Sequence, residues 1–212
     1  MFLLKNVKYK DILDISNLRI EKNKITSIVG ESGSGKTTLL RLLNKLISCD
    51  SGEILYRNES LNDIDSIELR RKVVMLPQAP VIFPGNIKDN LLIGLELAEK
   101  PKANDEKLQS VLKRVRLNKE LSNESSSLSG GEKQRLALAR VMLLEPDVFL
   151  LDEPSSALDE ETEDNIIEQL VECIKQTKKT LIMIIHSKKV AETYSDNIIE
   201  ISQGRIINVR EN

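Results

Sequence analysis

Residues 25–47 read ITSIVGESGSGKTTLLRLLNKLI, and this stretch decides the fold. Ile25 to Val29 is a short run of β-branched and small residues, which is typical of a buried strand. A glycine-rich turn follows, and leucines then recur on one broad face of a predicted helix from Lys36 to Ile47. A strand, a turn and a helix in this order form the repeating unit of parallel sheets, so we expect an α/β fold.

The turn from Gly30 to Thr37, called the phosphate loop below, fits the pattern G-x-x-x-x-G-K-[ST]. Its glycines allow backbone N–H groups to point inward and to form an anion-binding concavity at the start of a helix. In this pattern Lys36 supplies a point charge to the β- and γ-phosphates, and the Thr37 hydroxyl binds Mg²⁺. We therefore expect a nucleotide to contact Gly30, Glu31, Ser32, Gly33, Ser34, Gly35, Lys36, Thr37 and Thr38.

A second apolar strand ends in two carboxylates. The run from Val148 to Leu151 is followed directly by Asp152 and Glu153. A carboxylate at the end of such a strand is the expected partner of a phosphate loop, because it can hold the Mg²⁺ that accompanies the nucleotide. Glu153, one residue further, is placed to polarise an attacking water. The pattern predicts hydrolysis of a bound nucleoside triphosphate, with Asp152 on the metal and Glu153 as the base.

Residues 128–132, Leu-Ser-Gly-Gly-Glu, form a second helix start, called the signature loop below. Ser129 and Glu132 have the spacing of a capping box, so in isolation the segment predicts a plain helix N-terminus. The two glycines between them leave the first N–H groups of the helix uncovered, which creates a second anion-binding helix end. The residues expected at this second site are Ser129, Gly130, Gly131 and Glu132.

The rest of the chain alternates short β-branched runs with amphipathic stretches. We expect strands at residues 53–57, 73–76 and 181–185, helices at 132–144 and 159–175, and a terminal hairpin over 197–209. From residue 77 the strand-like pattern stops: three prolines follow, and then helical segments whose apolar residues share one face. Residues 122–129 are serine-rich and are predicted to be a loop. This middle region indicates a helical insertion in the sheet.

Composition and charge argue against a nucleic-acid-binding protein and against a membrane-spanning segment. The 212 residues carry a formal net charge of −2, with lysine and arginine scattered along the chain. The lack of a basic stripe argues against nucleic acid as a partner. The longest later apolar stretch runs from Leu181 to Ile185, whereas a membrane span needs about 20 residues. If the protein works at a membrane, we expect another protein to recruit it there.

The motifs occur in an order that resembles the ABC-type ATPases. The phosphate loop, the signature loop, the strand ending at Glu153, residues 156–159 (Ser-Ala-Leu-Asp) and His186 follow one another as in that family, and Gln78 lies where the family has its Q-loop glutamine. The resemblance extends from about Val7 to Ile207. It implies one domain over residues 1–212: a P-loop NTPase (RecA-like) core with an antiparallel β subdomain and a helical subdomain inserted at about 79–141.

The resemblance also implies a head-to-tail dimer. Each ATP would lie between the phosphate loop of one subunit and the signature loop of the other, so that Ser129 and Gly131 reach the γ-phosphate of the partner's ATP. Gln78 would sense Mg²⁺ and the attacking water, and His186 would contact the γ-phosphate. Asp159 would cross the dimer interface, and it is also a predicted N-cap for the helix that follows.

The remaining expectations concern adenine, the metal and catalysis. Tyr9 is the expected adenine-stacking aromatic, with Phe2 or a plain strand role as the alternatives. ATP and Mg²⁺ are the implied cofactors, with Thr37, Gln78 and Asp152 on the metal. The catalytic residues implied are Glu153, His186, Gln78 and Lys36.

The function implied is that of the ATP-hydrolysing subunit of an ABC transporter. It would be a cytoplasmic protein on the inner face of the cell membrane that drives a separate permease. The segment from Gln78 to Ile87 lies where this family docks its permease, and Ile82 and Phe83 either form that groove or pack the helical subdomain. The alternative that remains open is a soluble assembly factor such as the ATPase of iron–sulfur cluster biogenesis. A kinase of small metabolites is disfavoured, because it would need neither the signature loop nor a hydrolytic Glu153. The transported substrate, its direction and the choice between homodimer and heterodimer stay open, although two intact half-sites favour a homodimer.

Overall fold

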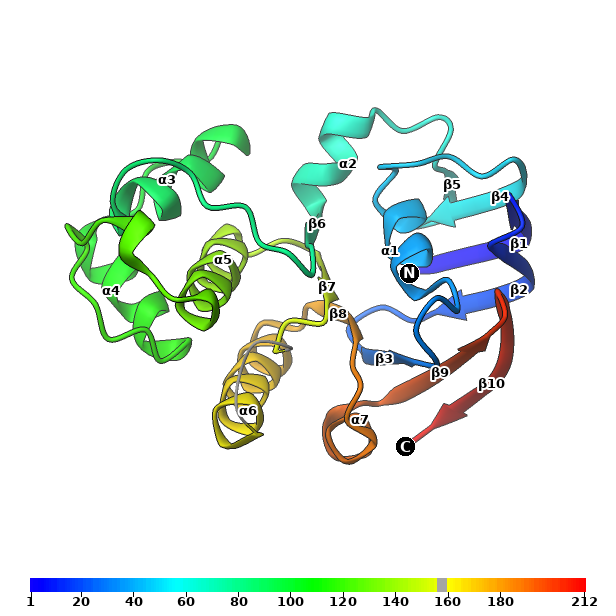
Figure 1. The fold of residues 1–212 in the computed structure, drawn as a ribbon. Helices are drawn as coiled ribbons and strands as arrows, with labels where there is room; N and C mark the ends of the chain where they lie inside the picture. Colours follow the sequence, from blue (N-terminus) through cyan, green and yellow to red (C-terminus); the bar gives the residue numbers. More distant parts are fainter. Residues whose placement is uncertain (156–159) are drawn as a thin grey trace.

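The computed structural model of the chain describes residues 1–155 and 160–212. Over these residues, the larger sheet has six strands in the order β10-β9-β3-β8-β7-β6 (Figure 1). Neighbouring strands are parallel except for the antiparallel pair of β9 and β10. The strands are β3 (Ile25–Val29), β6 (Val73–Leu76), β7 (Val148–Asp152), β8 (Thr180–Ile184), β9 (Asn197–Ser202) and β10 (Arg205–Glu211).

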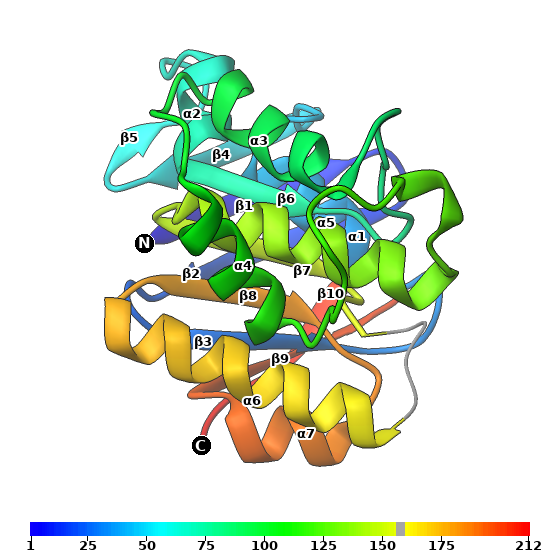
Figure 2. The ribbon, with the colours of Figure 1, turned by 90° about the vertical axis from the view of Figure 1, so that its left-hand side faces the viewer.

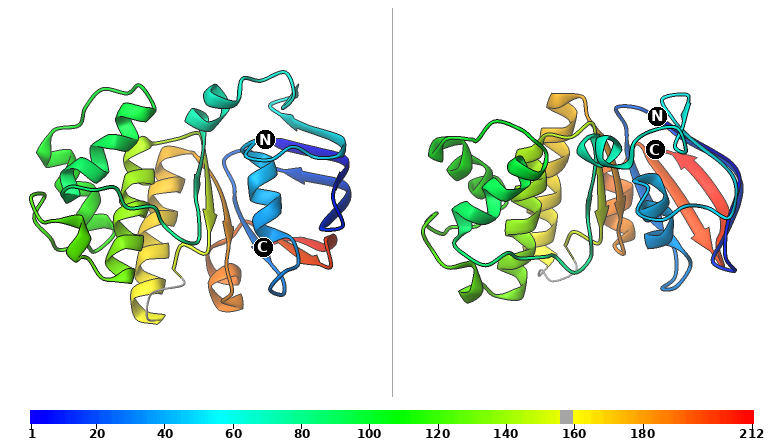
Figure 3. Two further views of the ribbon diagram at one scale, coloured as in Figure 1. Left: turned by 45° about the horizontal axis from the view of Figure 1, so that its top comes forward. Right: turned by 90° about the horizontal axis from the view of Figure 1, so that it is seen from above.

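A smaller antiparallel sheet lies beside β9 and β10, on the right in Figure 1, and its strands have the order β2-β1-β4-β5. Its strands are β1 (Phe2–Tyr9), β2 (Leu13–Ile20), β4 (Ser51–Tyr56) and β5 (Glu59–Ser60). Helix α1 (Lys36–Leu43) lies between the two sheets (Figure 3). Since α1 follows the phosphate loop, both sheets support the position of that loop.

Three helices are inserted between β6 and β7 and pack together as one layer. They are α3 (Ile87–Leu97), α4 (Asp105–Arg114) and α5 (Gly130–Leu144), with a short 3₁₀ turn at Ser125–Ser127 before α5. Figure 2 shows this layer in front of the sheets, beside α6 (Glu160–Thr177) and α7 (Lys188–Tyr194). Helix α2 (Ser66–Lys72) leads directly into β6.

Strand β7 separates two hydrophobic cores, because successive side chains of a strand point to opposite faces of the sheet. Phe149 and Leu151 belong to the core that includes α5, whereas Val148 and Leu150 belong to the core that includes α1. Helices α1 and α5 therefore cover opposite faces of the six-stranded sheet. The phosphate loop and the signature loop begin these two helices.

The expected α/β fold with its antiparallel sheet and inserted helices is confirmed. The predicted helix from Lys36 to Ile47 is too long, because α1 ends at Leu43 and Lys45 adopts a left-handed φ of 55°. Leu46, which the helix pattern placed on the apolar face, is 50% exposed. Helix α5 starts two residues earlier than predicted, directly after its cap. No described helix has both the length and the hydropathy required for a membrane span.

Candidate nucleotide site

The phosphate loop connects β3 to α1 and has the backbone of an anion-binding turn. Gly30, Gly33 and Gly35 have φ values of 146°, 78° and 100°, which side-chain-bearing residues rarely adopt. A Cβ on Gly30 would lie 2.1 Å from the carbonyl oxygen of Ile201, so this position also requires glycine for space. Lys36 is buried and its Nζ donates to the carbonyls of Gly30 (2.8 Å) and Glu31 (2.7 Å). The ammonium group therefore lies inside the turn that would receive phosphate, while Thr38 lies in the first turn of α1.

Two oxygen ligands suited to Mg²⁺ meet next to this loop. The Thr37 hydroxyl donates to Oδ1 of Asp152 at 3.1 Å. Asp152 is buried, and this burial raises the pKa of its carboxyl group above the ordinary value. A buried carboxyl group of this kind is stabilised in its charged form by a bound cation, and a hydroxyl with a carboxylate is a donor set that Mg²⁺ accepts. These residues therefore fit the expected metal.

Glu153 lies between two polar side chains from neighbouring strand ends. Gln78 Nε2 donates to its Oε2 at 2.6 Å, and His186 Nε2 lies 2.6 Å from its Oε1. The sheet order β8-β7-β6 explains the meeting, because all three strands are parallel and deliver the following residues to one edge. The structure brings together the three residues that the sequence motifs placed in separate segments.

Gln134 is a site residue that the sequence analysis missed. It lies in the second turn of α5, is buried, and donates through Nε2 to the carbonyl of Glu153 at 2.8 Å. Glu153 has a φ of 51°, a left-handed value that is uncommon for a residue with a side chain. The helix that begins with the signature loop therefore holds the backbone of the proposed base. Gln134 precedes the buried Leu138 by one helical turn, so a polar residue in register with the apolar face of α5 was the signal available in the sequence.

The signature loop forms the predicted capping box at the start of α5. Ser129 Oγ accepts from the Glu132 N–H at 3.3 Å, and Glu132 Oε2 accepts from the Ser129 N–H at 2.9 Å. This backbone hydrogen bond, together with Lys119 at 3.1 Å, lowers the pKa of Glu132. The N–H groups of Gly130 and Gly131 have no acceptor within the helix, as is general for the first turn. A Cβ on Gly130 would meet no heavy atom within 4 Å, so the helix end is open.

The turn between β1 and β2 lies against the phosphate loop. The position of a Cβ on Gly35 is 2.7 Å from Cδ2 of Leu13 and 3.1 Å from the carbonyl oxygen of Ile12. Tyr9, at the end of β1, packs in part on the core shared with α1, and Lys10 Nζ lies 5.3 Å from its ring centroid. Ile12 is 40% exposed next to the loop and was not singled out from the sequence. Asp159, the expected dimer-interface residue, lies outside the described residues.

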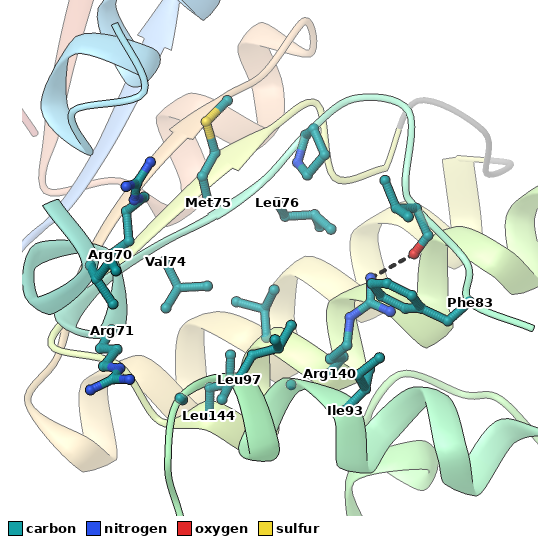
Figure 4. A pocket seen from close by; sticks show the side chains of 16 residues that line it. Arg70, Arg71, Val74, Met75, Leu76, Phe83, Ile93, Leu97, Arg140 and Leu144 are labelled. Carbon is teal, nitrogen blue, oxygen red and sulfur yellow. Dashed lines mark hydrogen bonds between the residues drawn. The ribbon is translucent and has the colours of Figure 1, made fainter. Parts of the chain in front are cut away.

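A groove of about 510 Å³ opens between α2, β6 and the inserted helices (Figure 4). Its wall includes Pro77, the neighbour of Gln78, and Phe83, which the sequence analysis placed in a docking segment. Ile82 instead packs against the core of the inserted helices. Val74, Leu97 and Leu144 lie in the middle of the groove, whereas Arg70 and Arg71 lie at one end and Arg140 at the other.

Comparison with known proteins places these features in one family. The family model described as "ABC transporter" matches residues 13–156. Protein STAR1 from Oryza sativa subsp. japonica is 39% identical over 201 residues, covering 94% of this chain and 58% of STAR1. The lactococcin transport/processing ATP-binding protein LcnC-like from Lactococcus lactis subsp. lactis (strain IL1403) is 41% identical over 211 residues, covering 93% of this chain and 28% of that protein.

A solved structure shares the whole fold. It is the dimeric, post-hydrolysis state of the ATP-binding cassette MJ0796 bound to ADP and Pi, with a TM-score of 0.88 and 29% identity. The match covers 100% of this chain and 98% of that one. The chain spans less than two thirds of the length of the rice and Lactococcus proteins.

Proposed function

Because the chain belongs to the ABC transporter family and is one of its ATP-hydrolysing domains, we propose that it powers transport through a separate membrane permease. The observation that carries this proposal is the groove beside Gln78, whose side chain bonds Glu153. A partner seated in the groove would contact the segment that leads to Gln78. Docking and hydrolysis would then be coupled through one hydrogen bond.

In the proposed reaction the phosphate loop binds ATP and Glu153 accepts a proton from the attacking water. The water oxygen forms a bond to the γ-phosphorus as the bond from the γ-phosphorus to its bridging oxygen breaks, and ADP leaves with its pair of electrons, which releases ADP and phosphate. Thr37, Asp152 and Gln78 would hold Mg²⁺, which would neutralise charge on the phosphate oxygens. Lys36 stabilises the charge that develops on the transferred group, and His186 contacts the γ-phosphate.

The proposed site is completed by a second copy of the chain, related head to tail. Helices α1 and α5 cover opposite faces of the same sheet, which argues against both loops of one chain acting on one nucleotide. In the dimer, Ser129, Gly130 and Gly131 meet the γ-phosphate held by the partner, and Asp159 lies at the interface. Glu132 keeps the N-terminus of α5 in its capped form.

The adenine contact is proposed for Tyr9, at the end of β1. Ile12, in the turn that follows, is the exposed apolar side chain next to the phosphate loop, and it offers a second contact to the base. Replacing Tyr9 with alanine is expected to raise the KM for ATP. If only Ile12→Ala raises it, the stacking role of Tyr9 is wrong and the contact belongs to the turn.

The location proposed is the inner face of the cell membrane, held there by the permease. The test is affinity purification of the tagged protein from mildly solubilised native membranes, with mass spectrometry of the copurifying chains. A polytopic membrane protein at comparable abundance is expected. If only soluble partners copurify, even with the Glu153→Gln variant held in its ATP-bound state, the protein is a soluble assembly factor and not a transporter subunit.

A further inference from the structure

The carboxylate of Glu132 lies in the first turn of α5, at the helix end that the proposed dimer presents to the partner's ATP. Both of its oxygens have partners: Oε2 accepts from the Ser129 N–H at 2.9 Å, and Lys119 Nζ lies 3.1 Å from Oε1. The bond to Ser129 directs the carboxylate to the backbone that precedes the helix. The N–H groups of Gly130 and Gly131 are therefore left for an external acceptor.

The charge of Glu132 is unfavourable for a phosphate at this helix end. A helix N-terminus attracts anions through its partial positive charge, whereas a full negative charge in the same turn repels them. The hydrogen bond from the Ser129 N–H and the ion pair with Lys119 lower the pKa of Glu132, so that this carboxyl group is ionised at neutral pH. The helix end should therefore bind phosphate more tightly when a cation offsets Glu132.

Lys119 is a cation that the fold places beside Glu132. It belongs to the segment between α4 and α5, and this segment is fixed on both sides of it. Leu117 is buried in the core of the inserted helices, and the Leu121 carbonyl accepts from the Lys88 N–H at 3.0 Å. The side chains of Lys119 and Glu132 are 38% and 20% exposed, so the ion pair lies at the surface, where a second subunit can approach it.

We propose that Lys119 is a positioning residue for ATP-dependent dimerisation, which acts through Glu132 by offsetting its charge next to the partner's γ-phosphate. This inference rests on the proposed head-to-tail dimer and gives a role to a residue outside the sequence motifs. If it is correct, the affinity between two copies of the chain follows the net charge of the pair formed by Lys119 and Glu132.

The test is the dissociation constant of the dimer that the Glu153→Gln protein forms with ATP and Mg²⁺, measured by sedimentation velocity. Lys119→Gln leaves Glu132 uncompensated and should weaken this dimer. Because a symmetric dimer contains the pair twice, an effect of about threefold at each site becomes about tenfold in the dissociation constant.

Replacing Glu132 distinguishes charge from structure. Glutamine also completes a capping box, so Glu132→Gln keeps the start of the helix and removes only the charge. Glu132→Gln alone should tighten the dimer, since Lys119 is then unopposed. The combined variant Lys119→Gln with Glu132→Gln has a neutral pair again and should dimerise like the Glu153→Gln protein that carries neither change.

Lys107→Gln is the matched control. Lys107 pairs with Glu145 at 2.8 Å at the other end of α5, so this variant removes the same charge from beside the same helix. A helix of 15 residues is about 22 Å long, whereas exposed charges are screened beyond about 8 Å at physiological ionic strength. The control should therefore leave the dissociation constant unchanged. The effect of Lys119→Gln should shrink as salt is raised, and Lys119→Arg should show no effect.

Three results would overturn the proposal. They are a dimer of Lys119→Gln that is as tight as before, a weakened dimer that Glu132→Gln does not restore, and a Glu132→Gln dimer that is no tighter. The third result applies even if Lys119→Gln disturbs its own loop. Nucleotide titration checks that each variant still binds ATP. Failure of the proposed dimer is a distinct result, because the Glu153→Gln protein itself would then bind ATP and remain monomeric, which overturns both proposals together.

Discussion

At the scale of the residue, Glu153 is the centre of the site. Its carboxylate is shared between Gln78 and His186, and its backbone carbonyl is held by Gln134. A left-handed φ of 51° stores strain that these bonds must offset. The arrangement would orient the proposed base before substrate arrives, which is the geometry that general-base catalysis requires.

Replacing Glu153 with glutamine should keep ATP binding and nearly abolish turnover. Glutamine has similar size and can still bond Gln78, but it cannot accept the proton of water, so kcat should fall by about two orders of magnitude or more. Steady-state hydrolysis and nucleotide titration measure the two quantities. Glu172→Gln, on the exposed side of α6, is the matched control. Turnover at the parental rate would show that another group is the base.

Gln134 is predicted to act as a positioning residue for Glu153. Gln134→Leu fills similar volume but removes the bond to the Glu153 carbonyl, so kcat should fall by about tenfold or more while the KM for ATP stays unchanged. Gln176→Leu, at an exposed position of α6, makes the same change away from the site. A rise in the KM for ATP together with the fall in kcat would instead indicate a general structural role for Gln134.

The sequence predicted several site residues one by one, but not the contacts between them. Gln78, Glu153 and His186 were predicted individually, because each follows an apolar strand or a family motif. Their mutual hydrogen bonds depend on the sheet order β8-β7-β6, which local patterns do not specify. Gln134 was missed for the same reason, because its partner lies 19 residues away, directly after β7.

At the scale of the element, Asn90 of α3 hydrogen-bonds the loop that follows β6. It is fully buried, accepts from the Phe83 N–H at 2.9 Å and donates to the carbonyls of Phe83 (2.9 Å) and Asn86 (3.0 Å). Ser125 Oγ donates to the same Phe83 carbonyl at 3.0 Å. Buried polar groups with complete bonding fix a unique loop conformation, and here they fix the wall of the groove.

Asn90→Ala should therefore destabilise the protein and loosen this loop. It leaves the partly buried N–H and carbonyl of Phe83 with fewer partners, so the free energy of unfolding should fall by about 2–4 kcal/mol. Urea denaturation measures the change, with the exposed Asn208→Ala as control. A loss equal to that of the control would mean that water replaces the side chain in all three bonds.

Element boundaries were predicted less well than element types. The strand patterns at β6 and β7 were correct, because apolar runs bounded by polar residues leave little choice of register. The end of α1 was placed at Ile47, since the leucine periodicity continues past Leu43. The chain leaves the helix there through Asn44 and the left-handed Lys45, and a residue type other than glycine gives no clear stop signal.

At the scale of the whole molecule, the two sheets and the helical layer place the starts of α1 and α5 on opposite faces of one sheet. The α/β class, the inserted helices and the order of motifs could be predicted from sequence because the pattern covers nearly the whole chain. The groove between α2, β6 and α5 could not, because its walls come from segments as far apart as Ile67 and Leu144. Its shape follows from packing and not from any local pattern.

The central claim is that ATP joins two copies of this chain through the phosphate loop of one and the signature loop of the other. The measurement that tests it most directly is sedimentation velocity of Glu153→Gln with and without ATP and Mg²⁺, alongside the double variant with Ser129→Glu. We predict a dimer only when ATP is present, and a monomer for the double variant under all conditions, because its added charge repels the partner's γ-phosphate. A Glu153→Gln protein that binds ATP and remains monomeric, or a double variant that dimerises equally well, would contradict the account.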